Sequence, residues 1–150
     1  MKWLITFLIV TILGAGGYLL AAYMTGGALP TFGIVLGGER GEVREVVLKF
    51  WEDLKFNDPR SASKLLLPTR QDIALVNNFL SQTFHGNPES LDVTGFEIVE
   101  IEIDSTGRRA RAKSKVLANL LTENRPIQIE TMFFLRKVKS KWYLDLSGSN

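Results

Sequence analysis

The segment that most constrains this chain is an uncharged, apolar run near its N-terminus. Residues Trp3 to Met24 read WLITFLIVTILGAGGYLLAAYM and include no Asp, Glu, Lys or Arg. A helix needs about 20 predominantly apolar residues to cross the ~30 Å hydrocarbon core of a bilayer. The length and composition of the run therefore predict a single-pass transmembrane anchor over residues 1–24.

The charges on either side of this run predict its orientation. Lys2 and the N-terminal amine precede it, and the next basic residue is Arg40. The positive-inside rule then places the N-terminus in the cytoplasm and the C-terminal domain outside, at the inner (cytoplasmic) membrane of a bacterium. The alternative is a cleaved signal peptide, with an apolar core from Leu4 to Leu13 and small residues at Gly26-Gly27-Ala28. The run is longer than a signal-peptide core, which favours the uncleaved anchor, and either outcome exports the domain.

Small residues form a stripe along one face of the predicted anchor. The helical period places the members of this stripe on one side: Gly14, Gly17, Ala21 and Thr25. Small side chains let two membrane helices approach closely, so the stripe is a candidate transmembrane helix interface. The alternative is that glycine and alanine are simply frequent in membrane helices.

Glycine marks the boundary between anchor and domain. Residues 25–41 read TGGALPTFGIVLGGERG and include six glycines and one proline, too many flexible positions for a stable helix. We predict a Gly-rich linker over residues 25–41 and one domain over residues 42–150, because the remaining ~110 residues suffice for a single core.

Helical periodicity opens the domain. Apolar residues from Val43 to Leu54 recur at helical spacing, with charged residues between them, and predict a long amphipathic helix. Asp58 before Pro59 predicts the start of a second helix over residues 59–67. Thr69 and Asp72 resemble a capping box for a third helix that ends before His85.

After His85 the apolar period changes to two and predicts four strands. The predicted strands are Phe96 to Asp104, Arg108 to Leu120, Pro126 to Val138 and Lys141 to Leu146. Their short connections predict an antiparallel meander. A change of parity in the first strand predicts a β-bulge near Val99-Glu100 and hence a bent sheet. The fold class is α+β, with helices packed on a bent antiparallel four-stranded meander.

Two stretches resemble a known family. The long opening helix VREVVLKFWEDLKFND and the closing pair TMFFLRKVKSKWYLDL are similar to those of the nuclear transport factor 2-like superfamily, which includes ketosteroid isomerase and polyketide cyclases. The resemblance spans roughly Glu42 to Leu146 and implies a cone-shaped α+β fold rather than a given activity. The resemblance also implies that the chain is a small, membrane-anchored bacterial member of this superfamily, with unknown activity.

Isomerase chemistry in such a cone would need a carboxylate base facing inward. The strand parity predicts that the carboxylates of the sheet all face outward: Glu97, Glu100, Glu102, Glu130 and Asp145. The side chains that we predict to line a pocket are Ser114, Thr131, Phe133 and Trp142. We therefore do not expect an enzyme.

Composition excludes several classes of chemistry. The chain has no cysteine and one histidine, His85, which excludes disulfides, thiolate metal sites and two-histidine metal sites. We expect His85 to be a turn residue at a helix end. The formal net charge of +2 is too small to indicate nucleic-acid binding. We expect no cofactor and no metal.

The outward face of the sheet is the candidate partner surface. Basic side chains occupy alternate positions of the second strand there, beside an apolar patch, and together these residues are Arg109, Arg111, Lys113, Lys115, Leu117, Met132 and Phe134. We expect Glu102 opposite Arg109 and Glu100 near Arg111, which makes the basic residues part of a cross-strand ion ladder. The alternative is an anion-facing surface.

These features favour a non-catalytic, membrane-anchored binding or assembly module, such as an accessory subunit of an inner-membrane or envelope complex. The expected partners are the lipid bilayer and other membrane or envelope proteins or a second copy, with no nucleic acid. The alternative is an exported small-ligand-binding or isomerase/cyclase-like enzyme domain that uses the cone interior. A filled interior favours the first hypothesis, and a deep open cavity with a buried carboxylate favours the second.

Overall fold

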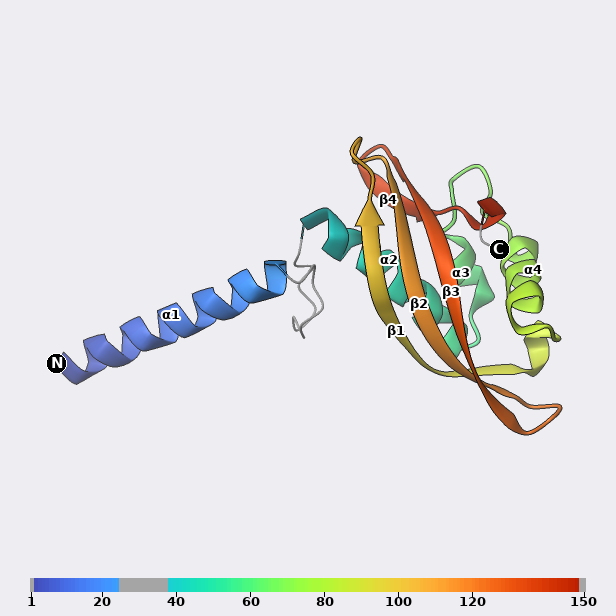
Figure 1. The fold of residues 1–150 in the computed structure, drawn as a ribbon, viewed down its shortest axis with the longest axis horizontal. Coiled ribbons are helices and arrows are strands. Elements are labelled where there is room, and N and C mark those ends of the chain that lie inside the picture. Colours follow the sequence, from blue (N-terminus) through green and yellow to red (C-terminus); the bar gives the residue numbers. More distant parts are fainter. Residues whose placement is uncertain (1, 25–37, 149–150) are drawn as a thin grey trace. The chain divides into compact units, whose positions relative to one another are not determined.

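The protein is represented by a computed structural model that describes residues 2–24 and 38–148, with the side chains of residues 2–10 and 22 outside this description. The chain divides into two compact units, Met1–Glu42 and Val43–Asn150. The first unit holds helix α1 (Lys2–Met24), one continuous helix of 23 residues (Figure 1). Within the fully described part of the chain, no helix is long and apolar enough to cross a membrane.

Helix α2 (Gly38–Lys55) begins inside the segment that the sequence assigns to the linker. The predicted linker therefore extends four residues too far, while residues 25–37 lie outside the described residues. Glu39 lies in the first turn of α2, where a carboxylate interacts favourably with the helix dipole. This interaction offsets part of the cost of placing glycine at Gly38 and Gly41 in a helix.

Helix α3 (Pro59–Ser63) is shorter than predicted. Asp58 caps it, as expected, by accepting a hydrogen bond from the Ser61 N–H at 3.0 Å. The chain then leaves helical geometry because its backbone bonds to strand β4 (Lys141–Leu144) instead. Leu67 N–H donates to the Leu144 carbonyl at 3.0 Å, and Leu144 N–H donates to the Leu65 carbonyl at 2.9 Å.

Helix α4 (Ile73–Phe84) has a different cap from the one predicted. The side chain of Asp72 itself accepts a hydrogen bond from the Ala74 N–H at 2.9 Å, so Asp72 is the N-cap and not the third residue of a capping box begun by Thr69. At the other end His85 adopts a left-handed conformation with φ of 52° and ends the helix, as expected.

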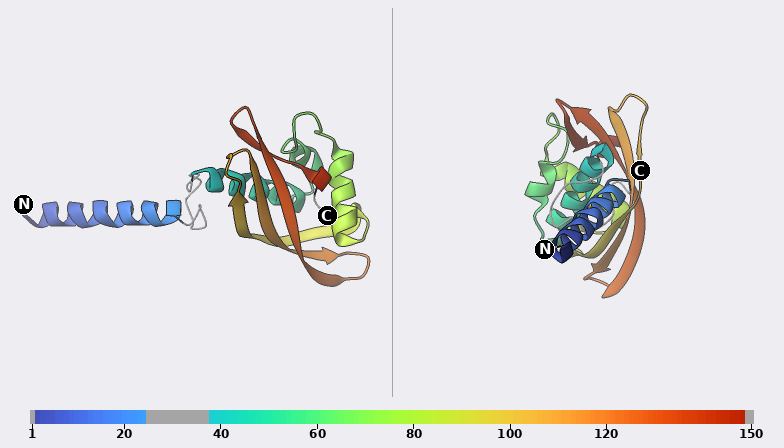
Figure 2. Two further views of the ribbon diagram at one scale, coloured as in Figure 1. Left: turned by 45° about the horizontal axis from the view of Figure 1, so that its top comes forward. Right: turned by 90° about the vertical axis from the view of Figure 1, so that its left-hand side faces the viewer.

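The strands form one antiparallel sheet in the order β1-β2-β3-β4, as predicted. With the short 3₁₀ helices η1 and η2, the C-terminal half comprises η1 (Pro88–Ser90), β1 (Leu91–Ile103), β2 (Arg109–Leu120), β3 (Arg125–Val138), β4 and η2 (Leu146–Gly148). Helices α2, α3 and α4 cover one face of the twisted sheet and leave the other face open (Figure 2). The α+β meander with helices on one side is thereby confirmed.

Strand β1 starts five residues earlier than predicted and bends at two places. The register with β2 shifts between Ile98 and Glu100, which leaves Val99 as the bulged residue and confirms the predicted bulge. A second shift between Val93 and Gly95 was not predicted. These two irregularities allow β1 to curve around the helices.

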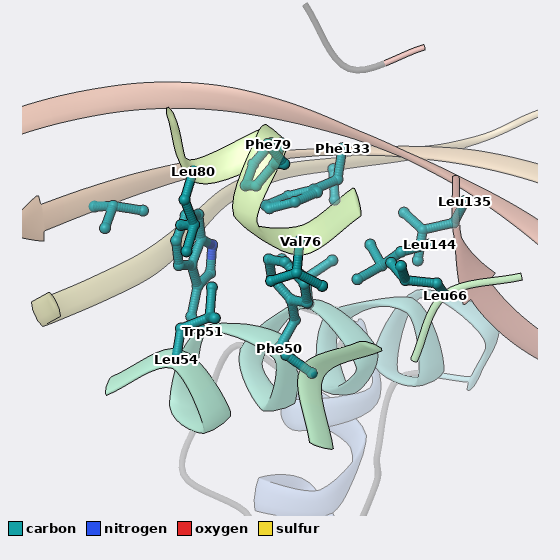
Figure 3. Packing of buried hydrophobic residues seen from close by; sticks show 14 of the residues in the cluster. Phe50, Trp51, Leu54, Leu66, Val76, Phe79, Leu80, Phe133, Leu135 and Leu144 are labelled. Atoms are coloured by element: carbon teal, nitrogen blue, oxygen red, sulfur yellow. The ribbon is translucent and has the colours of Figure 1, made fainter. Parts of the chain in front are cut away.

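The core lies between α2, α4 and the inner face of the sheet. Four aromatic side chains meet there, Phe50 and Trp51 from α2, Phe79 from α4 and Phe133 from β3 (Figure 3). The Phe133 ring centroid lies 5.3 Å from that of Phe79 and 5.4 Å from that of Phe50. Small buried residues of β2, including Ala112, leave room for this helix layer.

Candidate functional site

The inner face of the sheet is where a cone-shaped fold could hold a ligand, and its part around Phe133 and Ser114 is filled by protein side chains. Phe133, which the sequence places in a pocket lining, is fully buried in the aromatic cluster. Ser114 is also fully buried, and its Oγ accepts a hydrogen bond from Trp51 Nε1 at 3.1 Å. The hydroxyl that could have oriented a ligand thus bonds to a core side chain.

The other two predicted lining residues lie apart from this cluster. Trp142 is 5% exposed, and Lys137 Nζ lies 5.5 Å from the centroid of its ring. Among the described residues, Trp142 Nε1 has no hydrogen-bond partner. Thr131 is half-buried and lines a hollow of about 560 Å³ between β3 and the C-terminal part of α4.

That hollow opens at the surface and has one charged pair at its wall. Gln82 and Thr83 of α4 line it together with Thr131 of β3. Glu130 also lines it, but its Oε2 lies 2.6 Å from Lys113 Nζ. The hydrogen bond from Lys113 lowers the pKa of Glu130, so this carboxylate is a weak base at neutral pH.

Two carboxylates are buried in ion pairs, and the parity argument predicted neither burial. Asp145 is 5% exposed rather than outward-facing, and its Oδ2 lies 2.8 Å from Arg136 Nη2. Strand parity fails here because β4 ends at Leu144 and the chain turns into η2. Asp53 is 6% exposed, with Oδ1 2.6 Å from Lys49 Nζ.

The environment of Asp145 keeps it ionised. Burial alone would raise the pKa of its carboxyl, but hydrogen bonds from Ser147 and the charge of Arg136 outweigh burial and hold the pKa below its usual value. A general base that works near neutral pH needs a raised carboxyl pKa. Asp145 therefore stabilises the turn after β4 and is unsuited to proton abstraction.

The outer face of the sheet carries the predicted ladder of ion pairs, in a different register. Glu102 lies opposite Arg111, and Glu100 opposite Lys113, each two residues further along β2 than predicted. The turn causes this offset. The Asp104 carboxylate accepts hydrogen bonds from the N–H groups of Arg108 at 3.1 Å and Arg109 at 3.2 Å, which holds a wider loop than expected.

Most of the basic residues of this face are paired. Arg111 bonds to Glu102, and the hydrogen bond from Arg111 lowers the pKa of that carboxyl. Lys113 pairs with Glu130 at 2.6 Å, and Lys115 lies 3.8 Å from Glu97 and 3.9 Å from Glu130. The face is therefore nearly neutral in its middle, rather than a continuous anion-binding surface.

The apolar members of the candidate partner surface are exposed at separate places. Leu117 is 47% exposed and pairs with Gln128 toward the C-terminal end of β2, while Phe134 is 39% exposed and pairs with Arg111 near its start. Met132 lies between them along β3, opposite Lys113. Phe134 borders a shallow hollow of about 310 Å³ that Arg109 also lines.

The predicted helix stripe lies in the first unit. A Cβ added to Gly14 or Gly17 would meet no described atom within 4 Å, so the face they share is open within this part of the chain. Ala21 is exposed, and Thr25 lies outside the described residues.

Buried ion pairs were missed from the sequence. The Lys49–Asp53 pair had a readable signal, since residues four apart on a helix are neighbours. The Arg136–Asp145 pair joins β3 to the turn after β4 and has no such local signal. No group of three or more His, Asp or Glu residues that could hold a metal ion occurs among the described residues.

Comparison with known proteins yields structural likeness only. No family model matches the chain. No curated protein matches it. The solved structures to which it is similar include an NTF2-like protein of unknown function from Shewanella oneidensis MR-1, with 12% identity and a TM-score of 0.48 over 69% of this chain and 91% of that one.

Solved nuclear transport factor 2-like proteins are among the similar structures. A candidate polyketide cyclase from Xanthomonas campestris pv. campestris has 14% identity and a TM-score of 0.47 over 71% of this chain and 88% of its own. A protein of unknown function from Mycobacterium tuberculosis has 9% identity and a TM-score of 0.47 over 69% of this chain, which spans 65% of that protein. With TM-scores below 0.5, these matches assign no activity.

Proposed function

We propose that this protein is a non-catalytic binding or assembly module, anchored by α1 in the inner membrane, whose domain lies outside and engages a membrane or envelope protein through the open face of its sheet. The observation that carries the proposal is the contrast between the two faces. The inner face around Phe133 and Ser114 is filled by aromatic side chains, and helices α2, α3 and α4 of the domain leave the outer face uncovered.

A filled interior supports a binding role because catalysis in a cone needs space and an activated group. The inward hydroxyl of Ser114 is bonded to Trp51, and the buried carboxylate of Asp145 has a lowered pKa. The Ser114 hydroxyl is therefore part of the core, and the Asp145 carboxylate is a weak base.

The anchor is supported by the length of α1 and by its sequence. A helix of 23 residues is about 34 Å long at 1.5 Å per residue, close to the thickness of a bilayer core. The sequence from Trp3 to Met24 has no charge, and Lys2 precedes it. These properties support insertion with the N-terminus in the cytoplasm.

The outer face has the composition of a contact surface. Exposed Phe134 and Leu117 provide apolar area, and ion pairs flank both. Aromatic side chains often dominate binding energy when a ring of polar contacts excludes water around them. The partner that fits this surface is a protein with a complementary apolar and charged face, either another envelope protein or a second copy.

Photo-cross-linking in living cells tests the proposal. A photoreactive amino acid in place of Phe134 should give a discrete cross-linked protein, whereas the same amino acid in place of Lys64 should not, because Lys64 is exposed at the end of α3 on the helix side. Adducts from Lys64 but not from Phe134 would place the partner on the wrong face and refute the proposal.

The topology has its own test. An alkaline-phosphatase fusion at the C-terminus should be active, and the chain should resist extraction with alkaline carbonate. A mature form beginning near Leu29 would refute the anchor and leave export intact.

The alternative, a ligand-binding or isomerase/cyclase-like domain, has one observation in its favour, the hollow of about 560 Å³ between α4 and β3. Glu130 is the carboxylate that lines it. If this alternative is correct, Glu130→Gln should abolish turnover or ligand binding, and the Phe134 substitution should have no effect on either.

A further inference from the structure

One end of the domain collects basic side chains from two hairpin turns. We define the basic end as the described residues 104–109 and 137–141. Its charged members are Asp104, Arg108, Arg109, Lys137, Lys139 and Lys141. The two turns adjoin, since Lys137 N–H donates to the Arg108 carbonyl at 2.9 Å. Five basic side chains and one carboxylate therefore share one end of the sheet.

The basic end differs from the rest of the sheet in how its charges are compensated. Arg111, Lys113 and Lys115 all have carboxylate partners on neighbouring strands. Among the described residues, no ion pair joins Arg108, Lys139 or Lys141 to a carboxylate, and Arg109 lies near only the Asp104 carboxylate, whose pKa its charge helps to lower. The residual positive charge is available to an external anion.

The opposite end of the sheet has the other sign. Leu91 of β1 pairs with Leu120 of β2, so residues 85–92 and 121–125 lie together at the end where β1 starts. The charged or ionisable residues of these segments are His85, Glu89, Asp92, Glu123 and Arg125. Arg125 is paired with Glu123 at 3.3 Å. The domain is therefore polarised along its strands.

Helix α2 shows at which end the preceding chain enters the domain. Leu54, near its C-terminus, lines a small hollow with Leu91 and Val93, at the acidic end. Val43, the first residue of the second unit, lies eleven residues earlier on the same helix, about 16 Å toward the other end. Arg44, next to Val43, donates from Nη1 to the Ile98 carbonyl of β1 at 3.4 Å, so the chain enters the domain away from the acidic end.

We propose that the basic end binds the anionic phospholipid headgroups of the membrane in which α1 is anchored. This inference rests on the proposed anchor. Clustered Lys and Arg side chains near a membrane are attracted by the negative surface potential of anionic lipids, over about one Debye length. The polarity of the domain also orients it, because the acidic end is repelled by the same surface. Binding would hold the strands roughly perpendicular to the membrane surface and leave Phe134 accessible to a protein partner.

The local structure suits this contact. Lys139 and Ser140 both have positive φ, 47° and 68°, which is the geometry of a tight two-residue hairpin turn. Such a turn displays Lys139 and Lys141 at the tip of the sheet, and both are exposed. In the other turn Arg108 and Arg109 are exposed beside them.

A fluorescence experiment on the full-length chain tests the contact. The chain has no cysteine, so Ser105→Cys gives a unique labelling site in the turn that contains Arg108. The protein, labelled with an environment-sensitive dye, is reconstituted into vesicles of phosphatidylcholine alone or of phosphatidylcholine with phosphatidylglycerol. Thr122→Cys, in the turn at the acidic end, is the matched control.

The expected result is a blue shift and rise in emission from Ser105→Cys only in vesicles that contain phosphatidylglycerol, reversed by high salt. Lys139→Glu with Lys141→Glu should weaken this response at least about tenfold. Arg60→Glu with Lys64→Glu, the same change of charge on the helix side, should preserve it. The emission of the dye attached at Thr122→Cys should not differ between the two kinds of vesicle.

Flotation of the vesicles before and after alkaline carbonate tests the anchor independently of the lipid contact. A chain that floats in both lipids while Ser105→Cys responds equally to both retains its anchor and overturns the lipid contact. A chain that carbonate strips from both lipids, but that before carbonate floats only with phosphatidylglycerol and is released by salt, lacks the proposed anchor but keeps the contact as a peripheral one. Equal responses from both labelled ends would also overturn the inference.

Discussion

The two faces of the sheet use the same strands for opposite purposes. On the inner face Ala112, Ser114 and Phe133 are fully buried, and the one hydroxyl among them bonds to Trp51. On the outer face Phe134 is exposed and Arg111 and Lys113 form solvated ion pairs. This difference indicates that the inner face stabilises the fold. On our account, the outer face is the surface that recognises a partner.

The largest effect on stability is expected from removal of Trp51, the largest fully buried side chain of the inner core. Trp51→Ala deletes a fully buried indole and leaves Ser114 without its donor, so the free energy of unfolding should fall by about 3–5 kcal/mol. Chemical denaturation of the full-length chain in detergent measures it. His85→Ala, at an exposed helix end, is the control and should have a much smaller effect.

A smaller change tests whether the inward hydroxyl is structural. Ser114→Ala leaves the buried Trp51 Nε1 without an acceptor and should cost about 1–3 kcal/mol of stability. Ser105→Ala, in an exposed turn, is the matched control and should be neutral. Equal stabilities of the two variants would mean that Ser114 is not part of a closed interior.

The stability of the domain at acid pH tests the role of the buried Asp145 carboxylate. The pKa of Asp145 is lowered in the folded protein, so the stabilisation it provides is present above the unfolded-state pKa of about 3.9. It is lost as the pH falls through the lower folded-state value. Asp145→Asn should therefore destabilise the domain near neutral pH and lose less stability than the parent below pH ~4. Parallel acid-denaturation curves for the two proteins would contradict this assignment.

The outer face should give the reverse pattern. Leu117→Ser with Phe134→Ser should change the free energy of unfolding by about 1 kcal/mol or less, because both side chains are already exposed. The same pair should abolish cross-linking from neighbouring surface positions. Loss of folding with retained cross-linking would reverse our assignment of the two faces.

The smallest effect on the domain is expected from the anchor. Gly17→Ile with Ala21→Ile keeps α1 apolar but blocks close helix approach, so insertion and domain stability should be unchanged while helix association weakens. A membrane two-hybrid assay measures the association. If it persists, the partner contact lies on the sheet and the small-residue stripe only reflects the composition of membrane helices.

Periodicity predicted the sheet well because the inner face is buried over long stretches. The alternation of small and apolar residues in β2 and the change of parity at Val99 were enough to predict the meander and one bulge. The start of β1 was missed because Gly95 interrupts the alternation, although Leu91 and Val93 continue it.

The register of the outer ladder needed information that composition does not provide. The Asp104 carboxylate binds the backbone of Arg108 and Arg109 and widens the turn, so each cross-strand partner moves by two residues. The burial of Asp145 depends on a turn after β4 and on an arginine of another strand. Contacts between residues that are distant in the sequence cannot be predicted from local periodicity.

The closed interior is the central claim, and the indole N–H of Trp51 reports on it directly. With tryptophan labelled in ¹⁵N, the full-length chain in detergent should give three indole signals, one for each tryptophan. We predict that the Trp51 N–H exchanges with deuterium only through global unfolding and is not shifted by a library of small apolar ligands. Exchange within minutes under native conditions, or a ligand that shifts this signal, would show an open cavity behind the sheet and contradict the account.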